Sequence, residues 1–291
     1  MNVPSMPHVR EPFTPIWPGA LLLARGGVCD SGVMPWIKLD GAVNVRDLGG
    51  LPIADGGLTV DGRLLRADNL QDLSPADVTM LTRHIGVTTV VDLRSSYELE
   101  LEGPAPLDDV AGVRHEHHPV LPEVGAATDV VAEALRAKSD RDRTRYPANP
   151  VTGHYLGYLE DRPDQVVGAL RDIASAEGAA LVHCAAGKDR TGVVVALALT
   201  AVGVDKQAVI EDYAASAERV EAVIDRLRRS RTYGPDIGSK PASSQMVRPE
   251  TMAAFLEQMD SQYGGVGGWL ADHGFTAEDL RLLQAKLCRA G

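Results

Sequence analysis

A cysteine and an arginine stand near the two ends of one short segment of this sequence, residues 183–192. The segment reads His-Cys-Ala-Ala-Gly-Lys-Asp-Arg-Thr-Gly, with five residues between Cys184 and Arg190. A thiolate is a strong nucleophile, and the planar guanidinium of an arginine can hold two oxygens of a phosphate at once. If the chain curls so that both groups face one centre, they can bind and attack a phosphate, with a phosphocysteine as intermediate.

Two regular elements are expected to position this segment. Residues 178–182 are a turn and a short apolar run typical of a buried strand, and residues 193–204 are apolar and alanine-rich, which favours a helix. The segment is therefore predicted to be a loop between a strand and a helix N-terminus. Unpaired backbone N–H groups and the positive end of the helix dipole attract anions there. They also favour the thiolate form of a cysteine.

Other residues of the segment fit the same chemistry. Gly187 permits the curl, Gly192 lets the helix pack closely, and the hydroxyl of Thr191 can stabilise the sulfur as a leaving group. Lys188 would extend the substrate range toward acidic or multiply phosphorylated molecules. The residues predicted to bind phosphate or substrate are Ala185, Ala186, Gly187, Lys188 and Thr191.

The leaving group sets a further requirement. An alkoxide leaving from a serine or inositol phosphate needs a proton from a nearby acid. Asp189 is the first candidate because the loop itself carries it to the site, although a structural pair with Lys188 or with a loop amide is the alternative. Glu123, in the Pro-Val-Leu-Pro-Glu-Val-Gly stretch of residues 119–125, is the second candidate.

Two further groups of polar residues are interpreted as structural or as surface features. Asp92 follows a predicted buried strand, and a pair with Arg94 or Arg46 is favoured there over catalysis. His115 and His117 would share one face of a strand, but no carboxylate or cysteine at ligand spacing completes a metal site. We expect no metal and no cofactor.

The complete signature of residues 183–191 resembles that of the cysteine-dependent phosphatases of the protein tyrosine phosphatase superfamily. Lys188 and Asp189 narrow the resemblance to the atypical bacterial and fungal branch, whose loop reads His-Cys-x-x-Gly-Lys-Asp-Arg-Thr-Gly. Members of that branch, including a secreted mycobacterial phosphatase, hydrolyse phosphotyrosine, in some cases phosphoserine or phosphothreonine, and often phosphoinositides. The resemblance covers roughly residues 40 to 290, carried further by residues 44–50, 62–70, 86–95 and 203–216.

What the resemblance implies is a metal-independent phosphomonoester hydrolase. Cys184 would form the phosphocysteine, Arg190 would hold the phosphate, and the loop aspartate, Asp189, would have a functional role. A mobile loop is usual near Glu123, although an aspartate is the more usual residue there. Helices in the C-terminal region can form a lid over the active site in this family.

Two other interpretations of the loop do not fit its residues. A nucleotide-binding phosphate loop needs a glycine and a Ser or Thr where this chain has Val182 and Asp189. A Cys-x-x-Cys redox site needs a second cysteine where Gly187 stands. Two alternatives stay open: a phosphatase of a small metabolite such as a nucleotide or sugar phosphate, and a module that binds phosphate without turnover.

The composition limits the binding partners and the cellular compartment that we expect. The chain has 291 residues, a formal net charge of −11 and three cysteines. Nucleic acid is not expected as a partner because binding its backbone needs clustered basic residues, and no run of about twenty apolar residues predicts a membrane span. No convincing signal peptide is present, and a reactive thiolate needs a reducing setting. The cytoplasm is therefore expected, with export by an unrecognised signal left open.

The predicted fold class is α/β: a central, mainly parallel sheet with helices on both faces and the phosphate loop at the carboxyl ends of the strands. Residues 1–40 are expected to be an extension and residues 41–291 the phosphatase domain, in which residues 221–291 form a helical lid. A polar helix over 129–145 is expected as a flap. The basic residues of 226–231 are interpreted as a solvated face, or as a flank of the site that holds a second phosphate.

Overall fold

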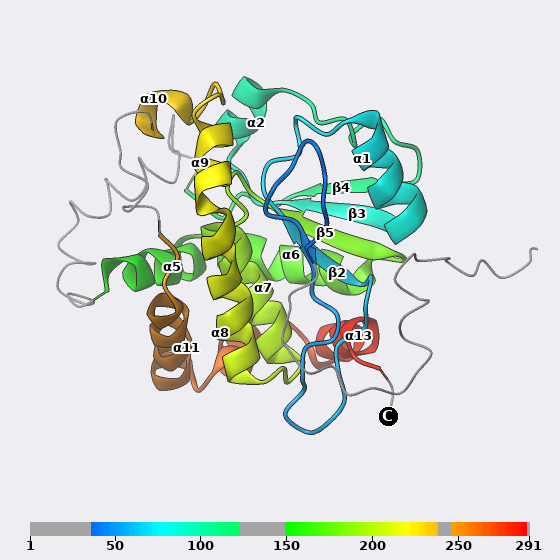
Figure 1. Ribbon diagram of the computed structural model, residues 1–291. Helices are drawn as coiled ribbons and strands as arrows, with labels where there is room; N and C mark the ends of the chain where they lie inside the picture. Colours follow the sequence, from blue (N-terminus) through cyan, green and yellow to red (C-terminus); the bar gives the residue numbers. More distant parts are fainter. Residues whose placement is uncertain (1–35, 123–148, 238–245, 290–291) are drawn as a thin grey trace, which may run out of the picture. The chain divides into compact units, whose positions relative to one another are not determined.

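The computed structural model describes residues 36–122, 149–237 and 246–289. Within the compact unit of residues 34–291, five strands form one sheet in the order β1-β2-β5-β3-β4 (Figure 1). β1 is antiparallel to β2, and the remaining neighbours are parallel. The strands are β1 (Arg46–Asp47), β2 (Leu64–Ala67), β3 (Val87–Asp92), β4 (Arg114–His117) and β5 (Ala179–His183). The predicted α/β class with a mainly parallel sheet is confirmed.

The central strands are apolar because helices cover both faces of the sheet. Along β5, Ala180 and Val182 belong to the larger core, whereas Ala179 and Leu181 belong to the smaller one. Val78 of α1 (Pro75–Thr79) packs against the smaller core, and the larger core includes the buried sides of the longer helices. α6 (Pro163–Ser175) packs on β3 and β4, and α7 (Asp189–Ala201) packs on β2 and β5. Other helices are α2 (Ser96–Glu102), α5 (Pro150–Asp161) and α13 (Ala277–Leu287).

α1 begins directly after Ser74, which caps the helix, and Pro75 stands in its first turn. The Ser74 hydroxyl accepts a hydrogen bond from the backbone N–H of Asp77 at 3.2 Å, and the Asp77 carboxylate accepts one from the N–H of Ser74 at 2.9 Å. After α1 the chain continues as a π-helical turn (Met80–Ile85) that ends at Gly86.

The C-terminal part is helical, as predicted. Gly234 and Pro235 begin a short helix of this part, because the fixed φ of proline suits a first helical turn. The predicted flap at 129–145 lies outside the described residues. The remaining helices are α8 (Lys206–Ala215), α9 (Val220–Leu227), α10 (Gly234–Ile237), α11 (Pro249–Tyr263) and α12 (Val266–Asp272).

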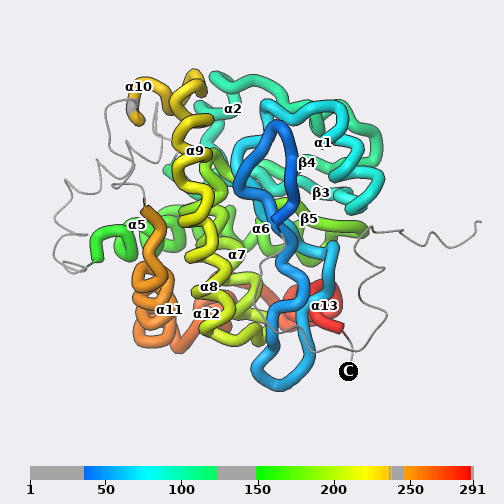
Figure 2. Tube along the Cα trace, in the orientation of Figure 1, coloured from blue at the N-terminus to red at the C-terminus, as the bar shows by residue number. Residues whose placement is uncertain are grey.

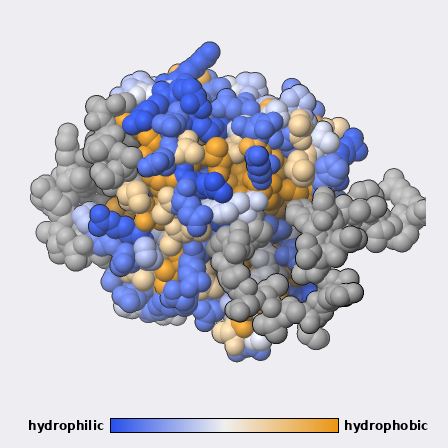
Figure 3. Space-filling model, in the orientation of Figure 1, coloured by the Kyte–Doolittle hydropathy of each residue, from blue (hydrophilic) through white to orange (hydrophobic). Residues whose placement is uncertain are grey.

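Segments far apart in sequence meet beside the phosphate loop. In Figure 2 the blue chain that carries β1 runs next to α8 and α9, and Trp36 Nε1 donates a hydrogen bond to Glu218 at 3.2 Å. Hydrophilic side chains dominate the upper part of the same view, with hydrophobic atoms showing through near the centre (Figure 3). Among the described residues, no helix is long and apolar enough to cross a membrane.

Candidate active site

The phosphate loop, residues 184–188, joins the end of β5 to the start of α7 at the carboxyl edge of the sheet. The order strand, loop, helix is therefore as predicted. Cys184 is 1% exposed, and Arg190, on the first turn of α7, is fully buried. The first N–H groups of a helix have no partner within the helix, so a helix start of this kind suits an anion. Thr191 is also buried, and its hydroxyl has no hydrogen-bond partner among the described residues.

Gly187 allows the loop to curl, as expected from the sequence. Its φ is +64°, a left-handed conformation that side chains disfavour, and a Cβ there would lie 2.4 Å from the carbonyl oxygen of Ala67. At Gly192, a Cβ would lie 2.9 Å from the ring of Tyr213. Both positions thus need glycine because the loop is pressed against β2 and the start of α7 against α8.

Polar groups from the N-terminal motifs bind the loop carbonyls from outside, and we call these the back contacts. The amide of Asn44 donates to the carbonyls of Ala186 and Gly187 at 3.0 and 3.2 Å. Arg66 donates to the carbonyl of Gly187 at 2.7 Å, and the backbone N–H of Asn69 donates to that of Ala185 at 3.0 Å. In a peptide group the N–H points opposite to the carbonyl. The N–H groups of Ala186, Gly187 and Lys188 are therefore turned toward the opposite side, where a phosphate would bind.

A buried ion network supports the back contacts. The carboxylate of Asp212, on α8, pairs with Arg46 at 2.8 Å and also with Arg66, and Arg46 donates to the Ser216 hydroxyl at 3.0 Å. Burial alone would raise the pKa of Asp212, but the charges of the two guanidinium groups hold it below its usual value. Burial, then the charge of Arg66, lowers the pKa of Arg46 to about 10.

A second set of contacts holds the side chain of Arg190, and we call these the front contacts on Arg190. Its guanidinium binds both carboxylate oxygens of Glu98, on α2, at 2.7 and 2.9 Å. It also donates to the Tyr233 hydroxyl at 2.8 Å, and that hydroxyl in turn donates to Glu98. Burial alone would raise the pKa of Glu98, but the charge of Arg190 and hydrogen bonds from Arg190 and Tyr233 hold it below its usual value.

Asp189, the first candidate for the general acid, has its own front contacts. One carboxylate oxygen accepts a hydrogen bond from the Tyr155 hydroxyl at 2.5 Å, and that hydroxyl lies 2.7 Å from the hydroxyl of Tyr213. The second carboxylate oxygen of Asp189 lies 3.4 Å from Lys188 Nζ. Burial, and then the charge of Asp189, raises the pKa of Tyr155 well above its usual value, so Tyr155 stays a neutral donor. The Lys188 pair considered as an alternative is present, and Tyr155 is a contact that the sequence did not indicate.

α9 covers the phosphate loop. Its buried residues and the loop enclose a cavity of about 20 Å³ whose lining includes Ala186, Lys188, Val223 and Ile224. The sequence predicts Arg226 on a solvated face or as a second phosphate ligand. Instead it is mostly buried and pairs with Asp68 and, at 3.2 Å, with Asp72, because α9 turns this arginine toward the end of β2.

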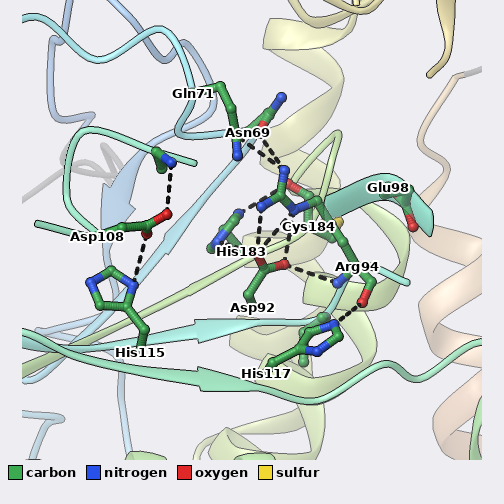
Figure 4. A network of polar contacts seen from close by, with 12 residues as sticks. Asn69, Gln71, Asp92, Arg94, Glu98, Asp108, His115, His117, His183 and Cys184 are labelled. Carbon is green, nitrogen blue, oxygen red and sulfur yellow. Dashed lines mark hydrogen bonds and ion pairs between the residues drawn. The ribbon is translucent and has the colours of Figure 1, made fainter. Parts of the chain in front are cut away.

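The remaining sequence candidates have structural contacts. Asp92 pairs with Arg94 at 2.5 to 3.0 Å, as predicted, and not with Arg46 (Figure 4). Burial alone would raise the pKa of Asp92, but His183, at 3.4 Å, and Arg94 hold it well below its usual value. Glu123 lies outside the described residues.

The three neighbouring histidines contact separate partners. His117 binds the carbonyl of Arg94 at 2.8 Å, and His118 binds Asp172 at 2.7 Å. His115 faces the carbonyl of Leu107 and the carboxylate of Asp108. In the part of the chain that the structure describes, no cluster of three or more histidine, cysteine, aspartate or glutamate side chains is arranged to hold a metal ion.

Sequence reasoning missed three residues that contact the candidate catalytic groups. Glu98 is visible in the sequence only as the fourth residue of a Ser-x-x-Glu capping box, which predicts a helix start and no contact with Arg190. Tyr233 and Tyr155 stand in stretches with no motif. Asn44 belongs to a stretch already noted for its resemblance, but the resemblance did not give its role.

The family comparison covers most of the chain. Residues 37–289 match the model of the tyrosine phosphatase family. The chain is 30% identical over 276 residues to the triple specificity protein phosphatase PtpB of Mycobacterium tuberculosis, covering 86% of this chain and 98% of that protein. It is 32% identical over 241 residues to a putative tyrosine-protein phosphatase of Cupriavidus necator, covering 81% and 83%.

A solved structure of TpbA from P. aeruginosa covers 67% of this chain and 86% of its own, with 20% identity and a TM-score of 0.31. The family match spans the sheet, the phosphate loop and the helices that cover it. The resemblance inferred from the loop is thus confirmed over nearly the whole chain, and this protein is a hydrolase that belongs to the tyrosine phosphatase family.

Proposed function

We propose that this protein hydrolyses phosphomonoesters through a phosphocysteine formed on Cys184, without a metal ion. The observation that supports it is the loop itself: Cys184 and Arg190 flank a turn whose carbonyls are bound from behind by Asn44, Arg66 and Asn69. This leaves the amides on the side of the two candidate catalytic residues. Such preorganised donors stabilise charge that develops on a phosphoryl group.

The reaction has two steps. In the first, the sulfur of Cys184 forms a bond to phosphorus while the bond from phosphorus to the leaving oxygen breaks, and Asp189 gives that oxygen its proton. In the second, water attacks the phosphorus, its proton returns to Asp189, and the thiolate leaves with the help of the Thr191 hydroxyl. Arg190 and the loop amides hold the phosphoryl oxygens throughout, and Glu123 is the alternative acid.

The proposed substrates are proteins with phosphotyrosine, phosphoserine or phosphothreonine, or phosphoinositides. The name of the mycobacterial relative, a triple specificity protein phosphatase, supports a broad range. α9 and Tyr233 cover the loop, so we propose that this part of the predicted lid region moves before a bulky substrate can reach Cys184. The reducing cytoplasm stays our prediction for the compartment, and residues 1–40 stay a predicted extension.

Exchange of one atom tests the nucleophile. Cys184→Ser should lower hydrolysis of p-nitrophenyl phosphate by at least about a thousandfold, as loss of a nucleophile does in other enzymes, while affinity for inorganic phosphate is kept. Cys288→Ser is the matched control, because Cys288 is a partly buried cysteine after α13, and it should leave turnover unchanged. Retained turnover in Cys184→Ser refutes the proposal.

A comparison of leaving groups tests the acid. Asp189→Asn should slow an alkyl phosphate far more than p-nitrophenyl phosphate, since the p-nitrophenolate leaving group hardly needs a proton. Equal losses on both substrates would assign Asp189 a binding role. The same pair of measurements on Glu123→Gln tests the second candidate.

The alternative function is hydrolysis of a small phosphorylated metabolite, favoured by the close cover over the loop. A panel of nucleotide and sugar phosphates, phosphopeptides and phosphoinositides, ranked by kcat/KM, separates the two. No turnover across the whole panel would favour a module that only binds phosphate.

A further inference from the structure

A second cavity, of about 380 Å³, lies between α2, the following segment of residues 103–108 and the carboxyl ends of β3, β4 and β5. Its volume is within the range of small-molecule sites, roughly 300 to 1,000 Å³. Figure 4 shows the polar side chains of this region. Asp92, Arg94 and His183 belong to the buried end of its lining, and Asp108 and His115 are more exposed.

This cavity is separate from the candidate active site. No residue of the phosphate loop lines it, and neither Arg190 nor Glu98 does. Its apolar wall includes Leu70, Val90 and Leu107, all from the smaller of the two cores. Cys184 belongs to the larger core, on the opposite side of the sheet. A molecule bound here would contact none of the residues predicted to bind phosphate.

The charged groups of the lining favour a cation over an anion. The lining includes the carboxylates of Asp92 and Asp108 and one guanidinium, that of Arg94. Glu116 also lines the cavity, but its side chain alternates along β4 to the face opposite that of His115 and His117. The guanidinium already donates to Asp92, Asn69 and Gln71, so it is engaged with neighbours rather than directed at an incoming anion. The carboxylate of Glu116 pairs with Arg114 at 3.3 Å. Asp108 accepts a hydrogen bond from the backbone N–H of Ala105 at 2.8 Å, and it is more exposed than Asp92, so it is the carboxylate best placed to receive a positive charge.

The contact between His115 and Asp108 also favours a positively charged hydrogen-bond donor nearby. His115 Nε2 lies 3.0 Å from the carbonyl oxygen of Leu107, which can only accept, so this nitrogen carries a proton. In the neutral ring, Nδ1 is then an acceptor, and it lies 3.2 Å from the Asp108 carboxylate, another acceptor. A cationic donor that contacts both atoms from one side satisfies them, as does a second proton on the ring.

We propose that this cavity is a binding site for a small organic monocation, an apolar body that carries one protonated amine. The body packs against Leu70, Val90 and Leu107, and the ammonium donates to Asp108 and His115. The site stands independently of the proposed catalytic mechanism, because its lining contains none of the residues assigned to that mechanism.

The test uses three probes that differ only in their head group: 4-phenylbutylamine, 4-phenylbutanol and 4-phenylbutyrate. Each is titrated into the full-length protein while the imidazole NMR signals of His115 and His117 are followed. The amine should shift both signals and bind at least about fivefold more tightly than the alcohol, as a partly exposed charge pair permits. The carboxylate should bind more weakly than the alcohol.

Two neighbouring aspartates provide a matched pair of variants. Asp108→Asn should weaken amine binding by about fivefold, whereas Asp109→Asn, which makes the same charge change one residue outside the lining, should change it less than twofold. Ala105→Phe should abolish binding by filling the cavity. Unchanged kinetics with p-nitrophenyl phosphate in the three variants show that the fold is intact. If Ala105→Phe does not fold, the comparison of Asp108→Asn with Asp109→Asn is sufficient to decide.

Several results overturn the site. They are an alcohol or a carboxylate that binds as tightly as the amine, equal effects of Asp108→Asn and Asp109→Asn, or no shift of the two histidine signals. Displacement of the amine by inorganic phosphate would place it in the active site instead. A Cys184→Ser protein that binds the amine normally, whatever its turnover, separates this proposal from the proposed function.

Discussion

The two sides of the phosphate loop are built differently. At the back, Asn44, Arg66 and Asn69 hold backbone carbonyls, and the Asp212 network anchors them. At the front, Glu98 and Tyr233 hold one side chain, that of Arg190. The back contacts therefore set the direction of the loop amides, whereas the front contacts set the position of a guanidinium.

This difference predicts different costs. A change at the back disturbs a buried network that ties β1, β2, α8 and the loop together, so it should act first on stability. A change at the front leaves the loop backbone in place, so it should act first on turnover. Measurements of stability and turnover in variants of both sides, and of stability at low pH, test this division.

Asp212→Asn should have the largest effect. It leaves the buried guanidinium groups of Arg46 and Arg66 without their carboxylate, and breaking a buried ion pair costs roughly 3 to 5 kcal/mol. The free energy of unfolding, measured in urea, should fall by about that amount. Asp225→Asn, at a surface pair with Arg228, is the control and should cost less than about 1 kcal/mol. A loss no larger than the control's would show that the back network is not structural.

Acid should have the second largest effect, by lowering the free energy of unfolding. The pKa values of Glu98, Asp92 and Asp212 are lowered in the fold from ordinary values of 4.5 for the glutamate and 3.8 for the two aspartates. Their stabilising contribution is therefore complete above the ordinary values and is lost as the pH falls through the lowered ones. A carboxyl whose pKa differs by one pH unit between the folded and unfolded chain contributes about 1.4 kcal/mol. Asp47 and Asp68, whose pKa values are raised chiefly by burial, act in the opposite direction.

Urea unfolding between pH 6 and pH 3 measures this loss. The free energy of unfolding should decrease with falling pH, and it should decrease less steeply in Asp212→Asn, which lacks one of the three carboxylates. A steepness equal to that of the unaltered protein would mean that Asp212 does not contribute.

Glu98→Gln tests the front contacts. Arg190 keeps its hydrogen bonds to Tyr233 and to the carbonyl of Leu93, but it loses the carboxylate that fixes its plane. We expect kcat for p-nitrophenyl phosphate to fall by about tenfold to a hundredfold, or roughly 1.4 to 2.7 kcal/mol. The loss of stability should be smaller than in Asp212→Asn, because one buried guanidinium loses its carboxylate instead of two. The reverse order of the two stability losses would contradict the division between back and front.

Tyr233→Phe should have the smallest effect. It removes one hydroxyl from the front contacts on Arg190 while the pair with Glu98 stays, and one hydrogen bond contributes about 0.5 to 1.5 kcal/mol. Steady-state kinetics should show a change in kcat/KM of less than about tenfold. A loss as large as that of Glu98→Gln would make Tyr233 an equal partner in holding Arg190.

The sequence predicts contacts of the site between residues close together in the chain better than contacts between residues far apart in the chain. The strand, loop and helix around Cys184 follow from apolar runs and glycines within residues 178–204, so local patterns were sufficient. The Glu98 contact joins Arg190 to a residue 92 positions away, and the Tyr233 contact spans 43. No local pattern carries that information. Arg226 was misplaced for a related reason: its basic neighbours indicate a solvated face, and only the packing of α9 shows that this arginine turns inward.

Passage of the phosphoryl group through Cys184 is the step on which the proposed function depends. It is measured by quenching the protein with acid during turnover of p-nitrophenyl phosphate, digesting it and locating the phosphoryl group by mass spectrometry. We expect one phosphoryl group per chain at most, carried on the peptide that contains Cys184 and absent from Cys184→Ser. A phosphoryl group on any other residue during turnover would contradict the proposed mechanism.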